Sequence, residues 1–293
     1  MQIDVNETNV SQADVNEYRE RGYWITPQLI EPGDVVKLRN AFDRIFHKDY
    51  DYDVFPADRV YSYDFEKPDL MKVNNGWWLN EEVRSVVLSS KLGKMISDLS
   101  GEAEIRIWHD QVVSKPGLAA FGLETDSANI GWHQDYAHWQ VSDNQNVCTL
   151  WIALQDTDLS NGGMRTIVGS HKWGLVPDAE TFHDKNLDGL REKYGKDREW
   201  IDEPCVLRAG QGSVHHCLTF HGSGPNRSDA PRMGMIIHYM PGGTAYRGRV
   251  HDPIKVPSGR KGNRHMNVPL LGPYTKPGDK FEGECFPLVW PND

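Results

Sequence analysis

The chain is poor in cysteine and has no long apolar segment. Its 293 residues contain four cysteines, at Cys148, Cys205, Cys217 and Cys285. None of them forms a C-x-x-C pair, so the sequence supports neither a zinc ribbon nor a thioredoxin-like redox motif. Reduced, mostly buried thiols are the expectation, as in cytoplasmic proteins. No apolar run approaches the roughly 20 residues that cross a bilayer.

Recognisable targeting segments are also missing from both ends of the sequence. Residues 1–5 are polar and acidic and lack the basic start and apolar stretch of a secretory signal. Residues 290–293 do not match a peroxisomal address. We therefore expect a cytoplasmic protein without a membrane partner.

Positive charge is scarce as well. The sequence has 32 Lys and Arg against 42 Asp and Glu, which gives a formal net charge of −10 at pH 7. Nucleic-acid binding needs clustered basic side chains, so we expect no nucleic-acid partner. A small anionic ligand held by one or two arginines remains compatible with this charge.

The composition is that of an ordinary soluble protein, with ten tryptophans and 38% hydrophobic residues. A chain of this length buries enough apolar surface to fold without disulfides, and it suits one large domain. We therefore expect a single domain over residues 1–293.

Helical patterns dominate the first hundred residues. Ser11 and Gly22 bracket a short predicted helix, and a strand over residues 23–26 follows, ending at Pro27. Apolar residues at helical spacing predict two further helices, one opening at Pro32 and one over residues 80–100. Core packing is the preferred interpretation of these apolar stripes, so residues 1–100 are expected to form a helical buttress.

Strand patterns and glycine-rich turns dominate the rest, up to residue 241. The predicted strands cover residues 104–108, 111–113, 147–156, 164–173 with a turn, 205–207, 213–221 and 231–239. Helices followed by many strands favour an all-β barrel or jelly roll over residues 101–241. Residues 242–293 are rich in Pro and Gly and are expected to form an extension, which is a candidate surface for a homo-oligomer.

Three stretches are predicted to be irregular. Residues 49–67 show no clear period, and residues 177–200 are charged and partly helical, as in a surface excursion. Residues 115–131 precede a candidate metal motif, so they are either a flap over a site or a plain surface connection.

The candidate metal motif is Gly131-Trp132-His133-Gln134-Asp135-Tyr136. On a strand, His133 and Asp135 point to the same face because they are two residues apart. A second histidine from elsewhere would complete a two-histidine, one-carboxylate set, which is typical of non-haem Fe(II) oxygenases. H-x-D alone is weak evidence, and an exposed His-Asp pair at a strand end is the alternative.

A second stretch, His221-Gly222-Ser223-Gly224-Pro225-Asn226, closes a predicted strand with a glycine-rich turn. His221 is the candidate third ligand, although the neighbouring His215 or His216 could replace it. Arg232 begins the next predicted strand, and a buried guanidinium forks onto a carboxylate with two parallel hydrogen bonds. Arg232 is therefore a candidate for holding the far carboxylate of a dicarboxylic co-substrate.

Four motifs in this order resemble the phytanoyl-CoA dioxygenase family of Fe(II)- and 2-oxoglutarate-dependent oxygenases. They are W-H-Q-D-Y at 132–136, W-x-A-L-x-D at 151–156, G-S-H-K at 169–172, and H-G-S-G-P-N at 221–226 with a downstream arginine. The resemblance covers most of the chain. It implies a double-stranded β-helix, a cupin-like jelly roll, with Fe(II), 2-oxoglutarate and O₂ as cofactor and co-substrates.

The resemblance also implies roles for single residues. It makes His133, Asp135 and His221 the iron ligands, which are also the catalytic residues. Around 2-oxoglutarate it places Arg232 and Ser223 at the distal carboxylate, Trp151 in the pocket wall, and, by looser alignment, Gln111 and Lys72. Trp132, Tyr136, His138 and Trp139 flank the metal motif and are candidates for a substrate pocket, with core packing as the alternative for each.

The implied reaction is hydroxylation of a small-molecule metabolite, with decarboxylation of 2-oxoglutarate to succinate and CO₂. Asp135 is present, so the chain lacks the missing-carboxylate pattern of related halogenases. The same iron site could instead serve desaturation, cyclisation or epoxidation. A non-oxidative, cupin-like metal-binding protein or isomerase is an alternative, but a simple cupin has no need for a carboxylate clamp at Arg232. A purely structural scaffold is a further alternative, in which the triad, the clamp and the glycine turn would be coincidental.

Overall fold

The computed structural model describes residues 2–52, 63–123, 129–176, 189–248 and 265–291. Parts of the irregular stretches predicted at 49–67, 115–131 and 177–200 therefore lie outside the described residues. Among those described, no helix is both long and apolar enough to cross a bilayer.

The first helix, α1 (Gln12–Arg21), has the predicted bounds. The Ser11 hydroxyl accepts a hydrogen bond from Asp14 N, and the Asp14 carboxylate accepts one from Ser11 N, which satisfies two backbone donors at the helix start. Gly22 ends the helix with a φ of 80°, a conformation that glycine adopts without steric cost. Helix α2 (Pro32–Phe46) follows as predicted and buries its apolar stripe.

The prediction of a single helix over residues 80–100 is wrong. The structure has two helices instead, α3 (Glu81–Val87) and α4 (Ser90–Ser100). Ser89 separates them because its backbone is extended and its hydroxyl accepts from Leu92 N, so it caps a new helix. The apolar spacing continues across the break, which is why the sequence pattern concealed it.

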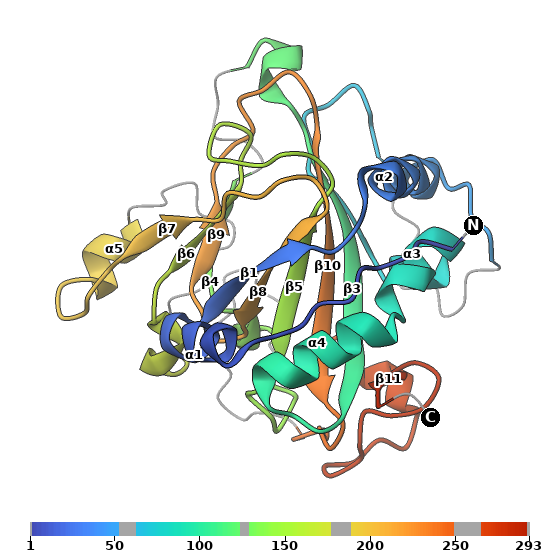
Figure 1. Cartoon of the computed structure of the whole chain (residues 1–293), viewed down its shortest axis with the longest axis vertical. Coiled ribbons are helices and arrows are strands. Elements are labelled where there is room, and N and C mark those ends of the chain that lie inside the picture. The colour runs from blue at the N-terminus through green and yellow to red at the C-terminus, as the bar shows by residue number, and fades with distance from the viewer. Residues whose placement is uncertain (1, 53–62, 124–128, 177–188, 249–264, 292–293) are drawn as a thin grey trace.

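Within the described residues, the strands form two antiparallel sheets (Figure 1). The larger has seven strands in the order β1-β8-β5-β10-β3-β11, with β2 also paired to β3. The smaller has the order β4-β9-β6-β7. This arrangement is a jelly roll, and the fold predicted from the sequence is confirmed.

The strands of the larger sheet are β1 (Tyr23–Gln28), β2 (Met71–Asn74), β3 (Ile105–Lys115), β5 (Cys148–Ala153), β8 (Gln211–His216), β10 (Arg232–Pro241) and β11 (Leu288–Trp290). Those of the smaller sheet are β4 (Ile130–His133), β6 (Met164–Ile167), β7 (Asp202–Pro204) and β9 (His221–Ser223). A further helix is α5 (Gly189–Tyr194), and 3₁₀ turns cover Gly76–Trp78, Leu118–Phe121, Asp135–Ala137, Ser170–Trp173 and Val268–Leu271.

Several predicted strand limits need correction. The strand predicted over 213–221 is two strands, β8 and β9, which belong to different sheets. The segments 104–108 and 111–113 are one strand, β3. In place of the strand predicted at 205–207, the structure has β7 just before it, and Leu207 only bridges to Thr157. β1 continues past Pro27 because it is an edge strand paired only to β8, where a missing N–H is tolerated.

The two faces of the larger sheet have different surroundings. Alternate residues of β5 and β10, such as Leu150, Ile152 and Met235, join one buried apolar cluster with helices α2, α3 and α4. Side chains of successive strand residues point to opposite faces, so Thr149 and Trp151 on β5 face the other sheet instead. The same holds for Arg232, Gly234, Ile236 and His238 on β10. Strand alternation therefore places the polar and ionisable side chains between the two sheets.

The terminal regions contribute to the larger sheet too. β1 and β2 come from the predicted helical buttress, and β11 comes from the Pro/Gly-rich extension and pairs with β3. The four cysteines are free thiols, as predicted.

Candidate active site

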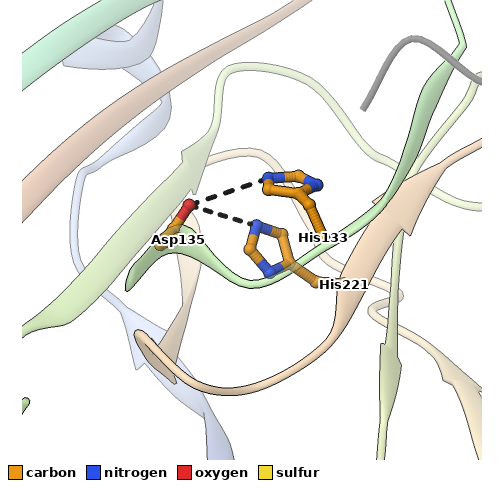
Figure 2. A group of neighbouring side chains, drawn as sticks. All are labelled: His133, Asp135 and His221. Carbon is orange, nitrogen blue, oxygen red and sulfur yellow. Dashed lines mark ion pairs between the residues drawn. The ribbon is translucent and has the colours of Figure 1, made fainter. Parts of the chain in front are cut away.

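Three ionisable side chains meet between the sheets. His133 ends β4, His221 begins β9 as its register partner, and Asp135 lies in the turn after β4. The Oδ1 atom of Asp135 lies 3.7 Å from His133 Nε2 and 3.6 Å from His221 Nε2 (Figure 2). One ligand atom from each residue lies within 4.8 Å of the others, close enough for one metal ion.

Both imidazoles are oriented by the backbone. His133 Nδ1 lies 2.8 Å from Gly131 O, and His221 Nδ1 lies 3.0 Å from Thr219 O. A carbonyl only accepts hydrogen bonds, so each Nδ1 carries the proton and each Nε2 has its lone pair available. Metal-bound histidines commonly use the second ring nitrogen in this way.

Burial keeps both rings neutral. It lowers the pKa of His221 to about 4 and the pKa of His133 well below its usual value, and the neighbouring imidazoles add to the effect. Burial by itself opposes ionisation of Asp135. The nearby His221 and a hydrogen bond from His215 outweigh burial and hold the pKa of Asp135 well below its ordinary value. Two neutral imidazoles and one carboxylate are the protonation states that metal binding requires.

The second oxygen of Asp135 is held from behind. Its Oδ2 accepts a hydrogen bond of 2.7 Å from the Thr149 hydroxyl and lies 3.3 Å from His215 Nε2. These contacts leave Oδ1 facing His133 and His221. His215 therefore lies behind the carboxylate, and the Nδ1 of His216 accepts from Leu218 N. The arrangement favours His221 over both neighbours as the third member of the group.

A second polar group lies at the start of β10. Arg232 and Lys115 are register partners on β10 and β3, and both side chains are buried. Lys115 Nζ donates hydrogen bonds of 2.6 Å to Ser223 Oγ and Gly224 O. The Arg232 guanidinium lies 5.1 Å from the centre of the Trp151 ring. Three residues predicted from the sequence, Arg232, Ser223 and Trp151, are thus brought together.

This second group contains two basic side chains and no acidic one among the described residues. Burial lowers the pKa of Arg232 to about 10, and burial together with Arg232 lowers the pKa of Lys115 well below its usual value. No acidic side chain among the described residues pairs with either cation, and Arg232 Nε has no hydrogen-bond partner there. Two buried basic side chains with an unused donor are suited to holding an anion.

The other predicted site residues divide into two sets. Lys72 lies on β2, where burial lowers its pKa to about 8 and the charge of Asp135 partly offsets that effect. Gln111 Nε2 lies 3.4 Å from His109 Nε2, and the His138 ring lies 6.3 Å from the His133 ring. Trp139 contacts the His238 ring at 4.7 Å. These four lie around the set formed by His133, Asp135 and His221, which we call the metal group because its ligand atoms could hold one metal ion.

The remaining two candidates have core surroundings. Trp132 packs with Ile167, Val176 and Phe220 in a separate apolar cluster. Tyr136 is buried and donates a hydrogen bond to Ser142 O. Their substrate-binding role stays a prediction that these contacts do not favour.

Sequence reasoning missed Lys115, Thr149, His109 and His238, which also face the space between the sheets. Their positions follow from strand pairing, because each lies opposite another interior residue on a neighbouring strand.

A jelly roll that carries two histidines and a carboxylate between its sheets defines a class, the non-haem iron oxygenases. The chain belongs to the phytanoyl-CoA dioxygenase family, whose model matches residues 18–234. The family and the enzyme class expected from the sequence, an Fe(II)- and 2-oxoglutarate-dependent oxygenase, are thereby confirmed.

Curated relatives carry out different reactions. A probable alpha-ketoglutarate-dependent hypophosphite dioxygenase of Stutzerimonas stutzeri is 29% identical over 61% of this chain and 62% of its own length. The ectoine dioxygenase of Streptomyces avermitilis is 24% identical over 78% of each chain. The chain thus spans less than two thirds of the length of the first relative.

Solved structures agree with the fold. The non-haem alpha-ketoglutarate-dependent carbocyclase SnoK from nogalamycin biosynthesis has a TM-score of 0.68 and 25% identity, covering 96% of this chain and 97% of its own. The epimerase SnoN from the same biosynthesis has a TM-score of 0.69 at 19% identity.

Proposed function

We propose that this protein hydroxylates a C–H bond of a small molecule, with conversion of 2-oxoglutarate to succinate and CO₂. The observation that carries the proposal is the pairing of two sites between the sheets. One is the group of His133, Asp135 and His221, and the other is the unneutralised pair of Arg232 and Lys115.

The first site fits Fe(II). The donor set of two neutral imidazoles and one carboxylate is the facial triad of non-haem iron oxygenases. In our proposal His133, Asp135 and His221 are the iron ligands, and Thr149 and His215 orient the carboxylate. Bound iron and 2-oxoglutarate would supply the oxidising chemistry with O₂, while the protein supplies orientation and limits water access.

The second site fits the distal carboxylate of 2-oxoglutarate. Arg232 offers an unused Nε–H donor in a buried position, and Ser223 and Lys115 lie beside it. The Trp151 indole forms a wall, since it lies over the guanidinium. Lys72 and Gln111, which lie closer to the metal group, would contact the metal-bound end of the co-substrate.

We also propose that residues 1–293 act as one domain, since β1, β2 and β11 from its two terminal regions complete the sheet that carries the site.

Cyclisation is the second candidate reaction, and the likeness to a carbocyclase over 96% of this chain supports it. The two reactions differ in product mass, because hydroxylation adds one oxygen atom and oxidative cyclisation removes two hydrogens. Mass spectrometry of the product distinguishes them. Membership of a dioxygenase family argues against a non-oxidative, cupin-like function.

The test is an anaerobic titration of metal-free protein with Fe(II) and 2-oxoglutarate, followed by visible absorption. We expect a weak charge-transfer band that needs both additions. The Arg232→Met variant should retain iron binding and weaken 2-oxoglutarate binding about 100-fold, because two charge-assisted hydrogen bonds are lost. Arg208→Met is the matched control, since Arg208 is exposed. Absence of the band in the unmodified protein would contradict the proposal.

A further inference from the structure

A second group of imidazoles lies behind the metal group and is not used by the proposed roles. His109 on β3 and His238 on β10 are register partners, and the centres of their rings are 4.3 Å apart. The His265 ring lies 5.4 Å from the His109 ring, and the Trp139 ring lies 4.7 Å from the His238 ring. His109 and His238 are both 3% exposed, so both are buried; we call this pair of rings the imidazole wall.

This wall lies at the opposite end of the interior from the anion site. Arg232 and His238 face the same side of β10 and are six residues apart, which places them about 20 Å apart along the strand. The metal group lies between them, since Asp135 is linked through Thr149 to His238 and Ser223 follows His221 toward Lys115. A co-substrate that reaches from Arg232 to the metal therefore leaves the His109–His238 end for the substrate.

Hydrogen bonding fixes which nitrogen of His238 carries the proton. The Thr149 hydroxyl has one hydrogen, and it donates this to Asp135 Oδ2 because a carboxylate only accepts. The contact of 2.8 Å between Thr149 Oγ1 and His238 Nδ1 then requires Nδ1–H to be the donor. In the neutral ring, His238 Nε2 is consequently an acceptor. It is buried, and it has no hydrogen-bond partner among the described residues.

His109 has the complementary pattern. Gln111 Nε2 is an amide donor that lies 3.4 Å from His109 Nε2, so Nε2 accepts and Nδ1 carries the proton. His109 Nδ1–H is also buried and without a partner in the described part of the chain. The two neighbouring rings thus present one unused donor and one unused acceptor, and buried groups of this kind are costly unless a ligand satisfies them.

We propose that His109 and His238 form a substrate-binding subsite for a hydroxyl group. A hydroxyl oxygen accepts from His109 Nδ1–H and donates its hydrogen to His238 Nε2. A carboxylate is disfavoured, because it has no hydrogen to donate and its charge would face the lone pair of His238. The inference rests on the proposed function, since it names the substrate class of the same site.

The test compares three probes that share one ring: phenol, anisole and benzoate. Phenol both donates and accepts, anisole only accepts, and benzoate only accepts and carries a negative charge. Binding is followed by saturation-transfer NMR on metal-free protein with 2-oxoglutarate in excess, so that the carboxylate site at Arg232 is filled; the measurement needs neither iron nor turnover. We expect phenol to bind about tenfold more tightly than either of the other probes, the effect of one hydrogen bond.

Variants locate the preference. His238→Phe and His109→Phe should each remove the advantage of phenol, while circular dichroism remains as in the unmodified protein. His216→Phe is the matched control, because this imidazole lies on β8 and contacts His171 instead. It should keep the preference for phenol.

The outcomes separate the two proposals. Tighter binding of benzoate, which the nearby Lys72 would favour, overturns the hydroxyl subsite, and so does equal binding of all three probes. Retention of the preference in His238→Phe and His109→Phe also overturns it. The probe comparison on unmodified protein remains decisive where a variant does not fold. Failure of the proposed function would show instead as a missing charge-transfer band, whatever the probes do.

Discussion

Replacing Thr149 by valine tests the orientation of the proposed carboxylate ligand. Valine has nearly the same shape as threonine, but it lacks the hydroxyl that donates a 2.7 Å hydrogen bond to Asp135 Oδ2. A hydrogen bond to a charged group contributes about 1.5–3 kcal/mol. Thr149 is 2% exposed, so water does not readily replace the lost donor.

The expected result is a weaker metal site. Losing a hydrogen bond that orients a metal ligand typically weakens metal binding about 10- to 100-fold, which agrees with that energy. The loss should grow as the pH falls, because a carboxylate without this donor has a higher pKa and protons compete with the metal. Anaerobic calorimetric titration with Fe(II) at two pH values measures both effects.

The control for this prediction is Thr244→Val. Thr244 is also a buried threonine with one hydroxyl hydrogen bond, of 2.7 Å to Pro241 O, but it follows β10 outside the site. This variant should lose about 1 kcal/mol of unfolding free energy and bind Fe(II) normally. If Thr149→Val bound Fe(II) as tightly as the Thr244→Val control, the assignment of Asp135 as an oriented iron ligand would be refuted.

Three further predictions follow from the same interior. Lys115→Met should weaken 2-oxoglutarate binding about tenfold, because a donor beside Arg232 is lost. It should also raise the unfolding free energy of the ligand-free protein by about 1 kcal/mol, because a buried basic group without an acidic partner is removed. Ligand titration and urea unfolding measure the two effects, and a stability loss with unchanged binding would contradict this prediction. Gly234→Ala should weaken 2-oxoglutarate binding about tenfold, since the new Cβ would lie 2.6 Å from Trp151 Nε1, whereas Gly243→Ala meets nothing within 4 Å and should change nothing in the same titration. The metal-free protein should lose stability as the pH falls from 7 toward 4, by up to about 1.4 kcal/mol per pH unit for each buried histidine, because the unfolded chain binds protons that the folded chain excludes. Burial lowers the pKa of His221 to about 4 and the pKa values of His238 and His265 to about 3. Burial raises the pKa of Asp110 to about 7, so this carboxyl gains stability as the pH falls, but it is one group against several histidines. A flat stability profile between pH 7 and 5 in urea unfolding would count against these neutral imidazoles.

The motifs of the sequence were sufficient for the family and the fold, and they included the three residues that the structure brings together, His133, Asp135 and His221. His133 and Asp135 are two residues apart on a chain that enters a turn, and local geometry alone brings them to one side. Arg232 was identifiable because an arginine at the start of an apolar strand needs an anion. Helix starts marked by a strong local signal, such as Ser11 and Pro32, were also predictable.

Local sequence patterns gave wrong predictions where two different structures have the same spacing of apolar residues. The apolar stripe over residues 80–100 suits one helix or two, and only the cap at Ser89 distinguishes them. The stretch 213–221 alternates like one strand, but its halves pair with different sheets. That choice depends on partners from distant parts of the chain, such as Thr149 for His215 and Ile130 for Ser223.

The surroundings of the site were decided by the tertiary structure alone. Lys115 lies beside Arg232, and His109 lies beside His238, because β3 and β10 pair in one particular register. A shift of that register by one residue would turn each of these side chains to the opposite face. Sequence determined which chemical groups the protein has, and long-range strand pairing determined which of them meet between the sheets.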